Sequence, residues 1–206
     1  MIITVEKKAK TKASQTYLAY AMGRCMCTAT VERLKDYILV NLDFGMESSR
    51  LEIYPNLKKV HINNNDLSIA AVSTGKVDTT ICYAEQEVKD NKVNYYETFL
   101  RSRHYKAYPV YLGAKGENLC IWDDHKLVCC AERIPVKKFD GLYTIYSSTM
   151  KSIDFVISLC VMWDLLEFDG KKNRLITKEV TRSNKQLLMY NPAFIAEVKN
   201  RDYYGR

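Results

Sequence analysis

Between residues 95 and 115, side chains that can contact phosphate alternate with rings that can stack on bases. Cations that meet the phosphate backbone and rings that stack on unpaired bases are the two requirements for binding single-stranded nucleic acid. Tyrosine is also a good strand former, so half of these rings are expected to face a core. The pattern predicts a binding surface that comprises Arg101, Arg103, Tyr105, Lys106 and Lys115.

The first twelve residues add Lys7, Lys8, Lys10 and Lys12 against a single acidic residue, Glu6. We interpret residues 1–12 as a flexible basic arm that assists the same surface through Lys7, Lys8 and Lys10. The formal net charge of +7 also favours an acidic partner, either nucleic acid or an acidic protein surface. Further basic residues at 137–138 and 171–178 either extend this surface or form a solvated face.

Catalytic motifs are short and incomplete. The tetrapeptide from Lys138 to Gly141 has the K-x-D-G spacing of a lysine nucleophile for nucleotidyl transfer, but its Asp140–Gly141 pair equally favours a hairpin turn. None of the histidines lies in a local signature with serine, cysteine or aspartate. An enzyme acting on a phosphate-bearing substrate, with His104 or His125 as acid or base, stays open as an alternative.

The cysteines lack the spacing of a metal site. Paired cysteines that chelate one tetrahedral ion usually have two to four residues between them, whereas Cys25 and Cys27 have one and Cys129 and Cys130 are adjacent. We therefore expect no metal and no cofactor. An odd count of seven cysteines, with no apolar leader segment at the start, favours reduced thiols and a cytoplasmic location.

Two amphipathic helices are predicted near the N-terminus. From Ser14 to Met26 the apolar residues fall on one helical stripe, and from Thr28 to Leu42 they recur at three and four residues. The polar residues between them would face solvent. A third helix is expected at Tyr95–His104.

Strands are expected in the middle of the chain, where short apolar runs are separated by turn residues. The predicted strands cover residues 51–54, 59–62, 67–73, 77–83, 107–112, 119–122, 126–131, 134–139, 142–146 and 174–180. The turns include Asp123–Asp124 and Asp140–Gly141, and their short spacing indicates an antiparallel sheet.

The segment near residues 150–167 is apolar on nearly every side and is too short and too acidic for a membrane span, so it predicts a buried central helix. Gly170 would end this helix, and Asn191 with Pro192 would start a terminal helix through Lys199. The predicted class is α+β, in one domain of 206 residues. N-terminal helices would accompany an antiparallel sheet, open or barrel-like, packed around the buried helix.

The function expected from these features is non-enzymatic binding of nucleic acid or an acidic protein partner. A structural or assembly role, for example in a virus, is an alternative in which exposed strands drive homo-oligomerisation. The phosphate-directed hydrolase or transferase is the other alternative.

Overall fold

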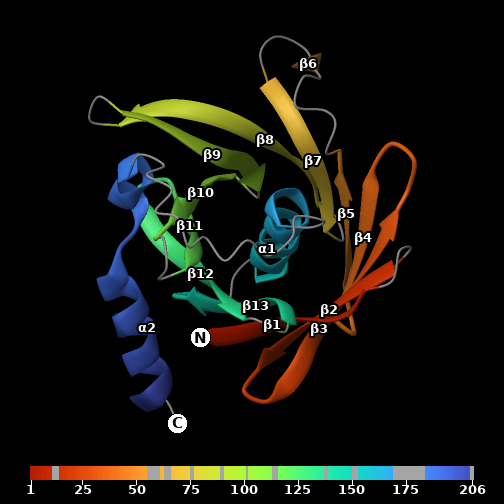
Figure 1. Ribbon diagram of the computed structural model, residues 1–206, viewed down its shortest axis with the longest axis horizontal. Coiled ribbons are helices and arrows are strands. Elements are labelled where there is room, and N and C mark those ends of the chain that lie inside the picture. The colour runs from red at the N-terminus through yellow and green to blue at the C-terminus, as the bar shows by residue number, and fades with distance from the viewer. Residues whose placement is uncertain are drawn as a thin grey trace.

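One antiparallel sheet dominates the computed structural model (Figure 1). The structure describes residues 1–10, 14–54, 61–62, 66–74, 77–88, 91–100, 102–112, 116–136, 139–149, 153–168 and 184–204. The strands are β1 (Ile2–Lys10), β2 (Ser14–Ala21), β3 (Arg24–Arg33), β4 (Ile38–Asp43), β5 (Ser48–Ile53), β6 (His61–Ile62), β7 (Asp66–Thr74), β8 (Val77–Val88), β9 (Asn91–Leu100), β10 (Arg103–Tyr111), β11 (Glu117–Asp123), β12 (Lys126–Val136) and β13 (Phe139–Ser147). The helical segments are α1 (Ile153–Glu167), the 3₁₀ helix η2 (Asn184–Met189) and α2 (Pro192–Tyr204).

Strands that follow one another in the chain mostly lie side by side, in the order β5-β4-β3-β2-β1-β13-β12-β11-β10-β9-β8-β7-β6. β1 also pairs with β13, with Ile3 opposite Ile145. β5 pairs with β7, with Leu51 opposite Val72, and this contact closes the sheet into a ring. Closure pairs the edges that an open sheet would leave exposed.

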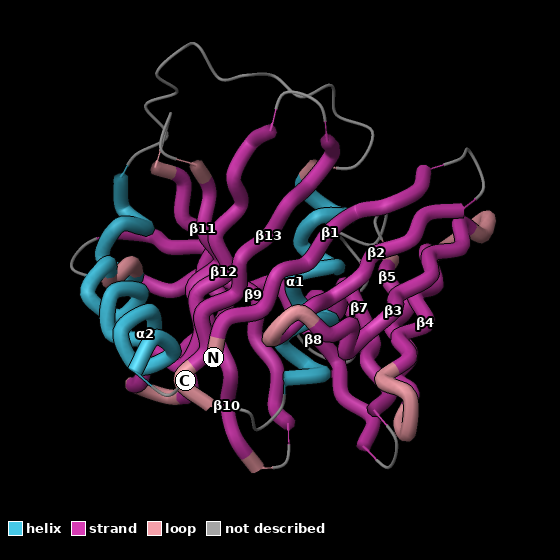
Figure 2. The backbone as a smooth tube through the Cα atoms, turned by 90° about the horizontal axis from the view of Figure 1, so that it is seen from below, coloured by secondary structure: helices cyan, strands magenta, loops and turns pink. Residues whose placement is uncertain are grey.

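The ring has two distinct ends, because every pairing is antiparallel and alternate strands run in the same direction (Figure 2). β1, β3, β5, β8, β10 and β12 finish at one end, which we call the Asp164 end. The other strands of the ring finish at the opposite end, the Met22 end. Since α1 follows β13 in the chain, it begins near the Met22 end and finishes near the Asp164 end.

α1 fills the interior of the closed sheet (Figure 1). Every residue from Phe155 to Leu165 is buried. A ring of about eight strands is just filled by its own side chains, so a wider ring leaves space that something else must occupy. Here α1 shares one core with inward-facing strand residues such as Ile3 and Val31.

A second core lies on the outer face of the sheet, beneath α2 and η2 (Figure 2). Phe194 and Val198 of α2 are buried there. α2 begins as the sequence predicts, with Pro192 as its first residue and Asn191 as its cap: Asn191 Oδ1 accepts a hydrogen bond of 3.1 Å from the amide of Ala193. In the described residues, neither α1 nor α2 is long and apolar enough to span a membrane.

The predicted α+β class with N-terminal helices is wrong, because the N-terminal chain is made of strands. The segment 14–26 forms β2 and the start of β3 with a turn between them, and the segment 28–42 forms the rest of β3 and most of β4, again with a turn between them. In β2, Tyr17 faces the core, but Leu18 and Tyr20 on the outer face are also partly buried. With both faces carrying large apolar or aromatic groups, the period of two is hidden and helical spacing fits by chance. The protein is mostly β, with one helix inside the ring.

Other local expectations are also corrected. Residues 95–104 form the β9–β10 hairpin rather than a helix. Asp140 and Gly141 lie inside β13, and the chain instead reverses between the paired residues Val136 and Phe139. The turn predicted at Asp123–Asp124 is confirmed, with a left-handed φ of 50° at Asp124.

The first residues of the chain form β1, which is paired with β2 on one side and β13 on the other. The strand expected at 174–180, the basic residues at 171–178 and the helix stop at Gly170 lie outside the described residues.

Candidate functional site

The cations and rings of residues 95–115 do not share one surface, because neighbours along a strand point to opposite faces. In β10, Tyr105 points into the ring, and its ring centre lies 5.4 Å from that of Phe155 in α1. Lys106 points outward and donates a hydrogen bond of 2.9 Å to Gln86 Oε1. Tyr105 is therefore a core residue and cannot stack on a base together with Lys106.

Acidic groups already accompany the remaining charges of β9 and β10. Arg103 forms an ion pair with Asp123 at the Met22 end. His104 Nε2 lies 3.0 Å from Glu97 Oε2, and the imidazole stacks on Phe99 with 4.3 Å between the ring centres. These carboxylates already pair with Arg103 and His104, so the two groups offer little unpaired positive charge to a phosphate chain.

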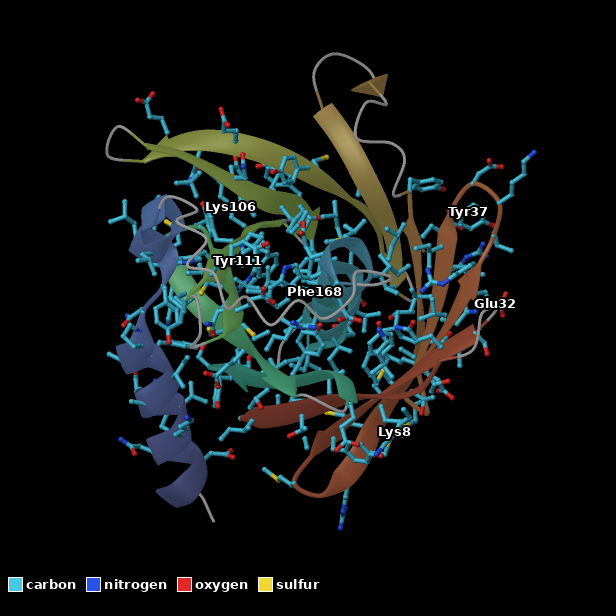
Figure 3. All side chains as sticks on the ribbon, viewed as in Figure 1. Lys8, Glu32, Tyr37, Lys106, Tyr111 and Phe168 are labelled. Carbon is cyan, nitrogen blue, oxygen red and sulfur yellow. The ribbon has the colours of Figure 1, made fainter. Side chains whose placement is uncertain are left out.

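Lys7 and Lys8 of β1 point to opposite faces of the sheet. Lys7 points inward and binds Asp164 of α1, whereas Lys8 points outward and pairs with Glu6. Lys8 is four strands away from Lys106 in the sheet order, which corresponds to roughly 19 Å along the sheet. Figure 3 shows these two lysines far apart.

Three of the predicted site residues cannot be placed as side chains. Arg101 and Lys115 lie outside the described residues, and the side chain of Lys10 is likewise outside the described part. The structure therefore does not bring the predicted set together as one patch.

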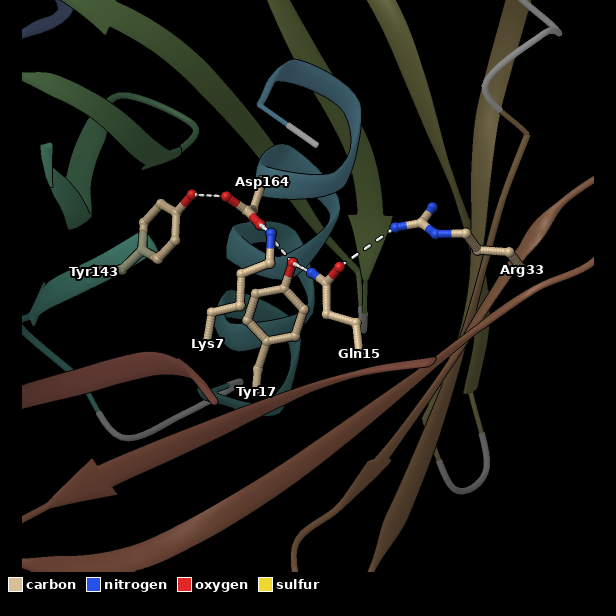
Figure 4. Close-up of polar contacts among 6 residues, drawn as sticks. All are labelled: Lys7, Gln15, Tyr17, Arg33, Tyr143 and Asp164. Atoms are coloured by element: carbon tan, nitrogen blue, oxygen red, sulfur yellow. Dashed lines mark hydrogen bonds and ion pairs between the residues drawn. The ribbon is translucent and has the colours of Figure 1, made fainter. Parts of the chain in front are cut away.

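A buried polar network that the sequence reading missed surrounds Asp164 (Figure 4). Its carboxylate is 1% exposed. Asp164 Oδ2 accepts hydrogen bonds from Lys7 Nζ, at 3.1 Å, and from the Tyr17 hydroxyl. Asp164 Oδ1 accepts one from the Tyr143 hydroxyl. The network thus joins α1 to β1, β2 and β13.

Two further residues extend this network towards the surface. Gln15 donates to the Tyr17 hydroxyl oxygen, and Arg33 Nη2 donates to Gln15 Oε1 at 3.4 Å. Arg33 is exposed, so the chain of hydrogen bonds runs from the surface of the Asp164 end to the buried carboxylate (Figure 4). Each donor in this series of hydrogen bonds points its hydrogen towards the next acceptor in the direction of Asp164. The hydrogen bonds therefore polarise one another in the same direction.

A second buried ion pair lies beside the first. Arg133 Nη1 donates to Glu117 Oε2 at 3.1 Å, and its guanidinium lies 3.9 Å from the centre of the Phe168 ring. Burial and the nearby Asp164 charge raise the pKa of Tyr143 well above its ordinary value, while Arg133 acts in the opposite sense. Lys7 and Arg133 also place positive charge at the C-terminal end of α1, where the helix dipole favours it.

On the surface of the Asp164 end, an aromatic pair stands beside cations. Tyr37 and Tyr54 are both partly exposed, and their ring centres are 5.7 Å apart at an angle of 38°. The connection between β3 and β4 that carries Tyr37 also carries the exposed Lys35, two residues after Arg33. The Tyr54 hydroxyl donates to Glu52 at 2.7 Å, which fixes that ring. We call Arg33, Lys35, Tyr37 and Tyr54 the tyrosine platform.

Lysines also recur in the connections that start at this end. Each strand that finishes at the Asp164 end is followed in the sequence, within six residues, by a lysine: Lys12, Lys35, Lys58, Lys89, Lys115 and Lys137. Of these, Lys35 is described, and the other five lie outside the described residues. The connections at the Met22 end carry Met22, Met46 and the pair Asp124–His125, and Lys76, Lys126 and Lys151 also follow strands that finish there within six residues. The lysines therefore do not by themselves distinguish the two ends.

The histidines lie apart from these groups. His125 is exposed at the β11–β12 turn of the Met22 end, His104 lies on the outer face, and the side chain of His61 in β6 is outside the described part. In the part of the chain that the structure describes, His104 and His125 belong to no group of three or more potential metal ligands. A site centred on one of these histidines therefore stays a prediction.

Comparison of the chain with models of known protein families, with curated proteins and with solved structures finds no match, so the function must be inferred from these groups alone.

Proposed function

We propose that this protein binds single-stranded nucleic acid at the Asp164 end of the closed sheet, with the tyrosine platform as the stacking site. The observation that carries the proposal is the pairing of partly exposed Tyr37 and Tyr54 rings next to the exposed Lys35. Stacking on an aromatic ring together with cations that follow the backbone is the usual arrangement for single strands.

The described contacts explain how the platform is held. β4 and β5 pair directly, with Ile38 opposite Ile53. Tyr37 directly precedes β4 and Tyr54 directly follows β5, so the pairing places the two tyrosines next to each other. Glu52 accepts a hydrogen bond from the Tyr54 hydroxyl, and this contact raises the pKa of that hydroxyl above its ordinary value. A rigid, neutral ring loses little conformational freedom when a base stacks on it.

The exposed cations Arg33 and Lys35 beside the rings support a partner with negative charge. A single strand offers such cations its phosphates while its bases stack on the rings. The partner of this proposal is therefore nucleic acid, and an acidic protein segment is an outcome that the experiment can reveal.

The test is binding of labelled single-stranded RNA and DNA across a series of salt concentrations. Tyr37→Ala is expected to weaken binding about 5- to 150-fold, because loss of one stacked base costs about 1–3 kcal/mol. Its salt dependence should stay unchanged. Lys35→Ala should instead make the slope of log K against log salt shallower by about 0.7, since one phosphate contact is lost.

Matched variants at the Met22 end provide the controls. Tyr20→Ala removes another partly exposed tyrosine, and Lys126→Ala removes another exposed lysine. Neither should change the affinity. Equal losses for Tyr37→Ala and Tyr20→Ala, or no binding at low salt, would show that the proposal is wrong. Salt-dependent binding of a polyglutamate peptide but not of nucleic acid would point to an acidic protein partner.

A further inference from the structure

Two cysteine side chains meet in the core between the sheet and its outer cover of η2 and α2. Cys120 of β11 and Cys130 of β12 lie opposite each other in the register of the two strands, and both are 0% exposed. Their sulfur atoms are 3.7 Å apart. Both belong to the outer-face core that Phe194 and Val198 of α2 complete. The pair is therefore a close dithiol that the cover separates from solvent.

The register of β11 and β12 suits a disulfide between these two residues. Residues opposite each other on antiparallel strands have Cα atoms about 4.5–5.5 Å apart, and a disulfide joins residues whose Cα atoms are about 4.4–6.8 Å apart. The sulfur atoms would have to approach from 3.7 Å to about 2.0 Å, which rotation of the two side chains provides. Cys129, the neighbour of Cys130, lies in the inner core and so does not compete for Cys120.

A buried amide beside the pair depends on the thiol proton of Cys130. Asn118 is 0% exposed, and its Oδ1 accepts a hydrogen bond of 3.5 Å from Cys130 Sγ. Among the described residues, its Nδ2 has no hydrogen-bond partner. A disulfide carries no S–H group, so oxidation would remove the donor to Oδ1 as well. A buried polar group that loses its partner costs free energy, which water could restore only if the cover lifted.

Trp122 fastens the cover to the same strand. It follows Cys120 by two residues, and its Nε1 donates a hydrogen bond of 3.3 Å to the backbone carbonyl of Met189, the last residue of η2. Tyr190 connects η2 to α2. Burial raises the pKa of Tyr190, and negative charge on Cys130 would raise it further, so this connection lies close to the sulfur atoms. The junction of η2 and α2 thus closes over the pair.

We propose that Cys120 and Cys130 form a reversible dithiol site that takes a low-molecular-weight disulfide, such as glutathione disulfide, as its oxidant, and that oxidation loosens η2 and α2 from the sheet. One thiolate attacks the oxidant, breaks its sulfur–sulfur bond and releases one small thiol. The second thiolate then attacks the mixed disulfide and releases the other small thiol. Two protein thiols are oxidised, the oxidant is reduced to two thiols, and the two protons pass to them.

The cover controls when this reaction takes place. Disulfide exchange needs a thiolate that the oxidant can reach. The contact with Cys120 and burial raise the pKa of Cys130 well above its ordinary value, so the closed protein keeps the thiol protonated. The rate therefore follows the population of molecules in which the cover has opened locally. This inference does not depend on the proposed nucleic-acid site, which lies at the Asp164 end of the ring.

The test is incubation of the folded full chain with glutathione disulfide, followed by peptide mapping by mass spectrometry. Cys25→Ser is the starting protein, because the exposed Cys25 would otherwise take up glutathione first. A bond between Cys120 and Cys130 is expected, with loss of two hydrogens and reversal by a reductant. Amide hydrogen exchange in α2 should then be faster than in the reduced protein, while exchange in β2 should not change.

Two further variants test the role of the cover. Trp122→Phe should speed disulfide formation about 2- to 12-fold, the range expected when one hydrogen bond of typical net strength is lost. Cys82→Ser removes a partly exposed thiol of β8 and should change neither the rate nor the product. Absence of the Cys120–Cys130 bond in both the starting protein and Trp122→Phe would overturn the proposal. A bond that forms at the same rate in both, or without any change in α2 exchange, would overturn the link to the cover.

Discussion

The Lys7–Asp164 ion pair is expected to couple the first strand to the central helix strongly, and a double-mutant cycle can measure this. Lys7→Met leaves the buried carboxylate with the Tyr17 and Tyr143 hydroxyls as donors. Asp164→Asn leaves a buried ammonium group without a carboxylate. In the double variant both charges are gone, and the amide oxygen of the asparagine can still accept a hydrogen bond from a tyrosine.

The magnitude follows from the geometry. Lys7 Nζ and Asp164 Oδ2 are 3.1 Å apart, and their side chains are 5% and 1% exposed. At that separation the Coulomb attraction is about 5 kcal/mol for an effective dielectric constant of about 20, before the cost of desolvation is subtracted. Removal of one partner of a buried pair costs about 3–5 kcal/mol, because the other charge is left buried. Replacing both partners by neutral groups avoids that penalty, so the coupling energy should be at least about 2 kcal/mol.

Urea unfolding at pH 7 provides the assay. Trp163 is fully buried next to Asp164 in α1 and reports the loss of tertiary structure by fluorescence. Far-ultraviolet circular dichroism on the same samples tests whether unfolding is two-state. If the destabilisation of the double variant equals the sum of the single variants within about 0.5 kcal/mol, the two residues are independent and the reasoning is refuted.

Three further results are expected. Burial raises the pKa of Tyr96 in the folded protein. The stability that this tyrosine contributes is complete below its unfolded pKa of about 10 and is lost above that pH at about 1.4 kcal/mol per pH unit. In urea unfolding from about pH 9 to 11, the free energy of unfolding should therefore fall less steeply for Tyr96→Phe than for the wild type. Gly116→Ala should cost at least about 2 kcal/mol in the same assay, because φ is +108° and a Cβ would lie 2.8 Å from the Arg133 carbonyl oxygen, whereas Gly45→Ala, with no atom within 4 Å, should cost less. Of the seven thiols, the exposed Cys25 should react first with a disulfide reagent in the native protein, and a burst of several thiols would contradict the packing.

The central helix was predictable and the strands around it were only partly so. Residues 153–167 are apolar on every side, and such a segment has to be covered by other elements wherever it lies. In the N-terminal part of the chain, the spacing of apolar residues suggested helices where the structure has strands. Val31, Leu34, Tyr37 and Ile38 have helical spacing, but Val31 and Ile38 are inward residues of two paired strands, and Leu34 and Tyr37 lie in the turn between those strands.

The interior network had one detectable signal in the sequence. Asp164 is an acidic residue within an apolar run, and a buried carboxylate requires a partner of opposite charge or several hydrogen-bond donors. Its partner could not be identified, because Lys7 is 157 residues away and meets it only after the ring has closed. The tyrosine platform was hidden for the same reason, since Tyr37 and Tyr54 meet through the register of β4 and β5.

The closed sheet also explains why surface function should be placed at its ends. Inward positions are occupied by the core around α1, and part of the outer face is covered by α2 and η2. The connections at the two ends, in contrast, do not have to satisfy the pairing and packing that constrain the strands. The tyrosine platform at the Asp164 end can therefore vary independently of the turns at the Met22 end, and the Lys7–Asp164 pair fixes the helix that links the two ends. A variant that weakens this pair should loosen the Asp164 end first, because α1 meets Lys7 only at its C-terminal turns.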